Sequence, residues 1–321
     1  MPLSPQEIVE GFDRRDRRLL SRALTLAESE APGFADLYDS LHGRVGRGAR
    51  LGITGPPGAG KSTLISELIR EYRGQDREVA VVAVDPSSPF TGGALLGDRV
   101  RMQDHILDPK VFIRSMATRG TLGGLSRTTH EVADLVDAFG FDRILLETVG
   151  VGQSEHDILS EADLVLVVLH PGAGDSVQTL KAGLTELADL FVLNKADQDG
   201  ADRLERDLHE MLELRFRDHG EEVPILRTVA TRGEGVRELV DEIEDQLREL
   251  SSEGELARRR QSRREAQVRR ILEQQLHSQL FGSNDEGGRI GAAQLSDTSL
   301  PPYTQARRLL EGLWSEKEIS E

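Results

Sequence analysis

Residues 55–62 read Gly-Pro-Pro-Gly-Ala-Gly-Lys-Ser, a spacing suited to binding phosphate. The glycines let backbone N–H groups turn inward around a polyphosphate, and a helix that follows adds the positive end of its dipole. In this pattern Lys61 reaches the β- and γ-phosphates, and the hydroxyl of Ser62 is a ligand for Mg²⁺. A chance glycine-rich turn is the alternative. An apolar run before the loop and a helical pattern after it favour the phosphate-binding interpretation.

We expect nucleotide contacts along the whole loop and at the start of the helix that follows it. The residues concerned are Gly55, Pro56, Pro57, Gly58, Ala59, Gly60, Lys61, Ser62 and Thr63. A phosphate loop by itself does not choose between ATP and GTP, or between an enzyme and a switch.

Residues 194–197 read Asn-Lys-Ala-Asp and directly follow the apolar run 190–193. A carboxylate at Asp197 accepts two hydrogen bonds from guanine, through N1–H and the exocyclic amine, and adenine offers neither. Lys195 would lie along the face of the base, and Asn194 would tie the loop to neighbouring backbone. The pattern therefore predicts GTP and GDP as ligands in preference to ATP.

Glu147-Thr148-Val149-Gly150 has the D-x-x-G form of a nucleotide switch, with Glu in place of Asp. The carboxylate of Glu147 would hold Mg²⁺ through water, and the N–H of Gly150 would touch the γ-phosphate, so that loss of this phosphate releases the loop. Many GTPases place a water-orienting Gln immediately after this Gly, whereas here Val151 stands there and Gln153 follows. We therefore expect slow unaided hydrolysis.

Further candidate groups follow the predicted strand 78–84. Asp85 ends that strand, where α/β proteins bind ligands, so it is a candidate for the Mg²⁺ environment; an Asp-Pro turn is the alternative. The glycine-rich and then charged segment 90–102 suits a loop that closes over a γ-phosphate. Within it, Asp98 is a candidate metal group and Arg101 a candidate charge stabiliser, although either residue could be a solvated helix position.

Two further candidates lie in the second half of the chain. Asp175 and Lys181 stand about one and a half helical turns apart and could form a pair that senses the nucleotide, although an ordinary surface salt bridge has the same spacing. His170, before them, is interpreted as a loop residue rather than a metal ligand. The backbone near Val229 and Ala230 could contact the guanine O6.

Short apolar runs alternate with helical patterns along most of the chain, as strands buried on both faces of a parallel sheet do. The predicted fold is therefore α/β: a P-loop NTPase with a mostly parallel central sheet flanked by helices. A helical extension, 1–45, precedes the nucleotide-binding domain, 46–250. A second helical extension, 251–321, follows it.

The second extension carries many arginines together with apolar residues at helical spacing. A nucleic-acid arm is one interpretation, but interspersed glutamates and the lack of an aromatic platform favour a packing or dimer helix. The arginines are Arg258, Arg259, Arg260, Arg263, Arg264, Arg269 and Arg270.

The composition narrows the choice of partners. The 321 residues carry 40 Lys and Arg against 56 Asp and Glu, a net charge of -16, which predicts repulsion from nucleic acid and from anionic membranes. With no cysteine, disulfides and thiolate metal sites are excluded. The apolar runs are shorter than the roughly 20 residues of a membrane span. We expect a cytoplasmic protein.

In order along the chain, these motifs resemble those of the methylmalonyl-CoA mutase-associated GTPases, the MeaB/ArgK group. The resemblance rests on the phosphate loop, Asp85-Pro86-Ser87-Ser88, Glu147-Thr148-Val149-Gly150-Val151-Gly152-Gln153, His170-Pro171-Gly172-Ala173-Gly174-Asp175 and Asn194-Lys195-Ala196-Asp197. It implies a homodimeric GTPase that acts as a chaperone of an adenosylcobalamin-dependent acyl-CoA mutase. Such proteins gate cofactor delivery from a cobalamin adenosyltransferase and protect or reactivate the mutase.

By the same resemblance, Ser62, Asp85, Asp98 and Glu147 form the Mg²⁺ environment, and Asp175 with Lys181 forms a further switch segment. Two alternatives share the nucleotide core. A nickel-inserting metallochaperone GTPase usually stores metal with His or Cys clusters, and this chain has no Cys and only scattered His. A P-loop kinase, the transport-system kinase label of some relatives, is disfavoured by Asn194-Lys195-Ala196-Asp197.

Overall fold

The computed structural model describes residues 4–29, 31–86, 102–118, 124–148, 160–172, 188–219, 223–281, 290 and 301–315. The chain divides into two compact units, residues 1–260 and 261–321. All the strands and the nucleotide-binding motifs belong to the first unit.

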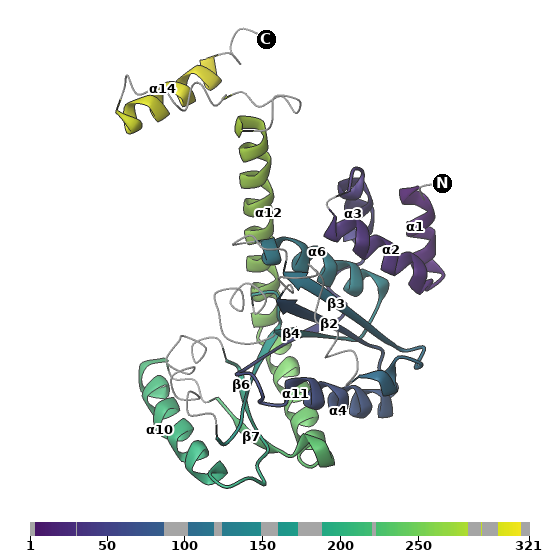
Figure 1. Ribbon diagram of the computed structural model, residues 1–321, viewed down its shortest axis with the longest axis vertical. Helices are drawn as coiled ribbons and strands as arrows, with labels where there is room; N and C mark the ends of the chain where they lie inside the picture. The colour runs from purple at the N-terminus through teal and green to yellow at the C-terminus, as the bar shows by residue number, and fades with distance from the viewer. Residues whose placement is uncertain are drawn as a thin grey trace. The chain divides into compact units, whose positions relative to one another are not determined.

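The first unit is built on a sheet of seven strands in the order β3-β2-β4-β1-β5-β6-β7. Figure 1 labels β3, β2, β4, β6 and β7 of this sheet. All its strand pairs are parallel, which confirms the predicted fold. The strands are β1 (Ala49–Thr54), β2 (Val79–Pro86), β3 (Val111–Thr118), β4 (Arg143–Thr148), β5 (Leu164–Leu169), β6 (Leu190–Asn194) and β7 (Ile225–Thr228). Their carboxyl ends share one edge, where ligands bind in open α/β sheets.

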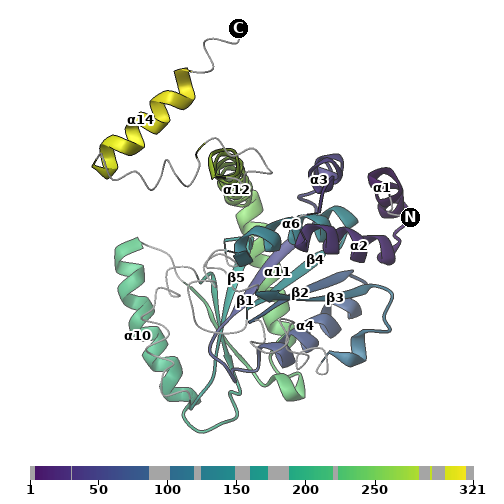
Figure 2. The same ribbon diagram turned by 45° about the horizontal axis from the view of Figure 1, so that its top comes forward.

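Helices α4 (Lys61–Gly74) and α11 (Val236–Ser252) cover one face of this sheet (Figure 2). Leu64 and Leu68 of α4 pack with Leu51 and Ile53 of β1 in a single buried cluster. Because alternate strand residues point to opposite faces, Leu51 and Ile53 face this cluster and Gly52, between them, does not. The packing fixes α4 directly behind the loop from which it starts.

The opposite face is covered in two parts. Helix α6 (Gly124–Phe139), with α1 (Pro5–Asp13), α2 (Arg17–Glu28) and α3 (Phe34–His42), packs over β2 and β4. Helix α10 (Ala201–His219) packs over β5 and β6 through Leu204, Leu208 and Leu212. These leucines recur every four residues, which is the spacing of one face of a helix. Short 3₁₀ turns, η1 (Gln103–His105) and η3 (Ala230–Arg232), complete this unit.

A buried charge network lies at the amino end of β1, at the sheet edge away from the motif loops. Arg50 pairs with Asp134 of α6, and His130 of α6 lies between Asp134, at 3.2 Å, and Glu161. Tyr38 of α3 donates a hydrogen bond to Asp134. Burial alone would lower the pKa of His130, but hydrogen bonds to Asp134 and Glu161 outweigh it and raise the pKa to about 9. The amino-terminal helices are therefore tied to the sheet by charge as well as by apolar packing.

Helix α12 (Glu255–Phe281) starts in the first unit, where Arg260 donates to Asp163 at 2.7 Å and to the carbonyl of Gly48 at 2.9 Å. The second unit contains the remainder of α12 and helix α14 (Pro302–Ser315). Among the described helices, none combines the length and the apolar character needed to cross a membrane.

Candidate functional site

The phosphate loop leaves β1 and enters α4 through glycines in left-handed or related conformations. Gly55, Gly58 and Gly60 have φ values of 139°, 80° and 88°, which side-chain-bearing residues rarely adopt. A Cβ on Gly55 would overlap the carbonyl of Val168, so β5 presses directly against the start of the loop. Gly60 precedes α4 without a side-chain cap. The N–H groups of the first helical turn therefore face the site without a capping side chain, as an anion site requires.

Lys61 folds back along this loop. Its side chain is buried, with 7% of the residue exposed, and its Nζ donates to the carbonyls of Gly55 at 2.7 Å and Pro56 at 3.2 Å. Because a buried ammonium needs hydrogen-bond acceptors, these carbonyls hold the charge at the centre of the loop. The ammonium is therefore placed where the pattern requires a phosphate-binding cation.

Ser62 and Glu147 come together although they are far apart in sequence. The Oγ of Ser62 donates to Oε1 of Glu147 at 2.8 Å, and Glu147 is only 3% exposed. Pairing of β1 with β4 sets Ile53 opposite Glu147, which delivers the carboxylate to the start of α4. A hydroxyl and a carboxylate oxygen are the hard donors that suit Mg²⁺, so this pair fits the expected metal chemistry.

The remaining switch and metal candidates are only partly described. Asp85 lies at the end of β2 with its backbone opposite Ala117 of β3, but its side chain is outside the described part of the chain. The other candidates also fall outside the described residues, and their roles stay predictions. They are Asp98, Arg101, Gly150, Asp175 and Lys181.

Asn194, at the end of β6, joins three segments. It is 2% exposed, and its Nδ2 donates to the carbonyl of Ala59 in the phosphate loop at 2.8 Å. Its Oδ1 accepts from the hydroxyl of Thr228 and from the N–H of Ala230, both at 3.1 Å. The amide thereby uses both its oxygen and its nitrogen, as a buried amide must. The predicted role of tying the loop to neighbouring backbone matches these contacts.

Lys195 and Asp197 lie beside Asn194 but are more exposed. Lys195 has a positive φ of 56°, and its Nζ donates to the carbonyl of Gly58 at 2.8 Å. The carboxylate of Asp197 accepts a hydrogen bond of 3.1 Å from Arg232 and is 37% exposed. Lys195 thus bridges the base-reading segment and the phosphate loop, while Asp197 stays accessible for a base.

The segment after β7 makes hydrogen bonds within the protein. The N–H of Val229 donates to the carbonyl of Glu234 at 2.9 Å, and the N–H of Ala230 donates to Asn194 at 3.1 Å. Both groups are therefore engaged within the protein. Contact between this backbone and the guanine O6 stays a prediction.

His170, which the sequence indicates as a loop residue, lies beside the phosphate loop. It follows β5, its Nδ1 lies 2.7 Å from the carbonyl of Pro171, and its Nε2 would lie 4.0 Å from a Cβ built on Gly58. Burial lowers the pKa of His170; the Pro171 carbonyl opposes this, and the charges of Lys195 and Lys61 lower the pKa further. In the sequence, the position of His170 at the carboxyl end of a predicted strand is what could have indicated that it lies near the ligand.

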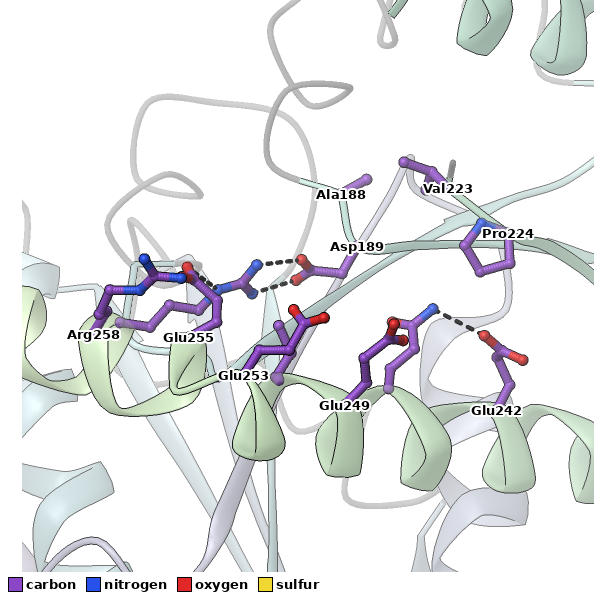
Figure 3. A pocket seen from close by; sticks show the side chains of 12 residues that line it. Ala188, Asp189, Val223, Pro224, Glu242, Glu249, Glu253, Glu255 and Arg258 are labelled. Carbon is purple, nitrogen blue, oxygen red and sulfur yellow. Dashed lines mark hydrogen bonds and ion pairs between the residues drawn. The ribbon is translucent and has the colours of Figure 1, made fainter. Parts of the chain in front are cut away.

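A separate cavity of about 540 Å³ lies at the opposite edge of the sheet (Figure 3). Ala188 and Asp189, just before β6, and Val223 and Pro224, just before β7, line it together with α11 and α12. Arg259 donates two hydrogen bonds to Asp189, at 3.0 and 2.9 Å. Dashed lines at Asp189 mark them in Figure 3. Because strand starts and not strand ends line this cavity, it does not belong to the nucleotide site.

Together these contacts bring groups from four neighbouring strands into one site. β1 supplies the phosphate loop, β4 supplies Glu147, β5 supplies His170 and β6 supplies Asn194 with the segment that follows. The start of α4 suits a polyphosphate, and the segment with Asp197 suits a base. The arrangement is suited to a purine nucleoside triphosphate.

Known proteins share both the sequence and this fold. The family described as "Methylmalonyl Co-A mutase-associated GTPase MeaB" matches residues 20–285. A relative from Pyrococcus horikoshii, assigned by its name to the GTPases, is 46% identical over 308 residues, which cover 95% of this chain and 97% of that protein. The GTPase ArgK of Escherichia coli is 36% identical over 319 residues and covers 95% of both chains.

A solved structure named as a LAO/AO transport system kinase is similar over 97% of each chain, with a TM-score of 0.70 and 28% sequence identity. Its similarity therefore extends through both terminal extensions.

Proposed function

From the premise that this chain belongs to the methylmalonyl Co-A mutase-associated GTPase family MeaB, we propose that it is a chaperone whose GTP hydrolysis controls an adenosylcobalamin-dependent acyl-CoA mutase. It gates delivery of the cofactor and protects or reactivates the mutase, which is of the methylmalonyl-CoA mutase type. The observation that carries this proposal is the family match over residues 20–285, which includes every motif of the nucleotide pocket.

GTP binds with its phosphates in the loop before α4 and its base beside Asp197. The ammonium of Lys61 and the N–H groups of the first turn of α4 hold the phosphates. Asp197 accepts hydrogen bonds from guanine, and Asn194 keeps the base-reading segment against the phosphate loop, as its bond to the Ala59 carbonyl supports.

Magnesium accompanies the nucleotide, and Ser62 and Glu147 hold it, with Asp85 and Asp98 as the further groups of the site. The bonded oxygens of Ser62 and Glu147 support this assignment, since both are hard donors. When bound, the ion neutralises charge on the β- and γ-phosphates.

Hydrolysis without a partner is slow, and the mutase accelerates it. Glu147 is held by Ser62, and Gly150 follows three residues later in the sequence, so a change at the γ-phosphate reaches this segment directly. Val151 replaces the water-orienting Gln that many GTPases have, which leaves the attacking water without that group. A partner that positions the attacking water then supplies the missing group. Arg101, Asp175 and Lys181 are the proposed charged groups that act with it.

The active form is a homodimer joined through α12. Val268, Leu272 and Leu276 recur every four residues along this helix and are 48%, 53% and 51% exposed. Exposure of such an apolar stripe to water is unfavourable, so its burial against the same helix of a second copy is favoured. Replacing all three with Gln should convert a dimer to a monomer in multi-angle light scattering.

A turnover assay with a methylmalonyl-CoA mutase and its adenosylcobalamin tests the proposed function. We expect GTP hydrolysis to rise when the mutase is added, ATP hydrolysis to stay low, and the mutase to keep its activity longer in the presence of this protein and GTP. A variant that lacks the Lys61 charge should give neither effect. Loading of the mutase from a cobalamin adenosyltransferase, followed by the cobalamin absorption spectrum, tests the gating step.

Two other measurements separate the alternative functions. Phosphate transfer from ATP or GTP to a small molecule or protein, with no mutase effect, would support a kinase instead. Tight nickel binding would support a metallochaperone, although the described residues contain no group of three or more His, Cys, Asp or Glu side chains arranged to hold a metal.

A further inference from the structure

The sheet topology brings His170 to the phosphate loop. β5 pairs with β1, so the carboxyl end of β5 lies beside the loop that leaves β1. The Nδ1 of His170 is 2.7 Å from the carbonyl oxygen of Pro171. Because a carbonyl only accepts hydrogen bonds, Nδ1 must carry a proton. In the neutral ring, Nε2 therefore carries a lone pair.

The lone-pair nitrogen lies beside the phosphate loop. A Cβ built on Gly58 would lie 4.0 Å from Nε2 of His170, and that glycine's carbonyl also accepts a hydrogen bond from Lys195. Among the described residues, the charges that act on His170 are the ammonium groups of Lys195 and Lys61. Burial and these two charges lower its pKa from 6.5, so the ring is neutral near pH 7 while the loop is empty.

A polyphosphate reverses this electrostatic situation. Its negative charge offsets the two lysines, and its oxygens repel a lone pair but accept a hydrogen bond from a protonated Nε2. We propose that His170 is a proton-linked phosphate sensor, neutral in the empty pocket and doubly protonated when the phosphates of a guanine nucleotide occupy the loop. The proton comes from solvent, and no other bond is made or broken. The inference rests on the phosphate position given under Proposed function but requires no mutase.

The sign of the pH dependence follows from linkage. A group whose pKa rises on binding takes up a proton, so affinity increases as pH falls through the interval between the two pKa values. For one proton the change is at most about tenfold per pH unit. His170 lowers the affinity for nucleotide at alkaline pH and raises it at neutral to weakly acidic pH.

Isothermal titration calorimetry with GDP and Mg²⁺ tests this sensor, because GDP is not turned over. Titrations near pH 7 in two buffers of different ionisation enthalpy, PIPES and Tris, give the number of protons taken up. We expect wild-type protein to take up a fraction of a proton more than the H170Q variant. The nucleotide's own ionisation is common to both proteins and cancels. His209, exposed on α10 away from the loop, gives the matched control H209Q, which should behave like wild type.

Equal proton uptake by wild type and H170Q would overturn the proposal. Absence of GDP binding by wild-type protein is a distinct result, which would overturn the nucleotide site itself. Should H170Q fail to fold, nitrogen-15 spectra of histidine-labelled wild type still decide the question. Before GDP is added, His170 should show a protonated Nδ1 and a bare Nε2, and afterwards both nitrogens should be protonated. An unchanged spectrum would contradict the inference.

Discussion

The side-chain amide of Asn194 donates a hydrogen bond of 2.8 Å to the carbonyl oxygen of Ala59, across 135 residues of chain. A Cβ on Gly60 would come within 2.5 Å of the same amide nitrogen. The two halves of the pocket are thus in direct contact. The buried side chain of Asn194 sets their spacing, and the absence of a side chain at Gly60 makes room for it.

Replacing Asn194 with Ala should lower both stability and nucleotide affinity. The change leaves the Ala59 carbonyl, the Thr228 hydroxyl and the Ala230 N–H without their partner. We expect a loss of about 2 kcal/mol in the free energy of unfolding, measured by urea denaturation. T228V is the matched control, since it removes only one donor and preserves shape, and it should cost about half as much. Equal stability of N194A and wild type would contradict this interpretation of the contacts.

Replacing Lys61 with Met should abolish tight GTP binding. The variant keeps the length of the side chain but loses the ammonium that Gly55 and Pro56 hold in the loop. We expect affinity to fall on the order of 100-fold in calorimetry, equivalent to about 2.7 kcal/mol. K110M removes a lysine that pairs with Asp76 at 2.7 Å on the surface and should bind GTP like wild type. If K61M also bound normally, the phosphates would have to lie elsewhere.

Replacing Asp197 with Asn should change the preferred base. An amide offers one donor and one acceptor in place of two acceptors, so it loses a contact to guanine and gains one to the 2-carbonyl of xanthine. We expect GTP affinity to fall by about 100-fold and the xanthine nucleotide to bind more tightly than to wild type. Asp199, exposed in the same loop, provides the control D199N, which should leave base preference unchanged. Unaltered preference in D197N would place the base outside this loop.

The buried His130 should make stability depend on pH. Its pKa in the folded protein is about 9, above the ordinary 6.5, so it stabilises fully below about pH 6.5 and the contribution is lost as pH rises through 9. The loss is at most about 3 kcal/mol, measured as the free energy of unfolding in urea across this interval. H130Q should lack this dependence, whereas H209Q should retain it. A wild-type stability that does not decline between these pH values would refute the assignment.

Much of the framework could be predicted because local patterns determine it. Continuous apolar runs such as 164–169 are sufficient to indicate strands buried on both faces, and β5 has those bounds. The loop 55–62 likewise requires its glycines for backbone reasons that operate within a few residues. The leucine spacing of helix α10 is an equally local pattern.

Contacts between segments that are far apart in the chain could not be predicted from such local patterns. Nothing in the sequence near His130 indicates that Glu161 lies against it, because α6 and the segment before β5 meet only after the sheet forms. The same holds for His170, whose nearness to Gly58 follows from the pairing of β5 with β1. The order of the strands in the sheet determines which strand ends become neighbours, and no single run of residues determines that order.

Because all the strands run in the same direction, the sheet has two rims, one at the carboxyl ends and one at the amino ends of its strands, and these rims can be altered independently. On one rim, Lys61 is expected to exchange the carbonyls of Gly55 and Pro56 for phosphate oxygens with every round of nucleotide binding. On the other rim, Arg50 and Asp134 form a buried ion pair that takes no part in this exchange. Engineering for heat resistance can therefore concentrate on the rim with Arg50 and Asp134, where stronger contacts need not slow nucleotide turnover at the other rim.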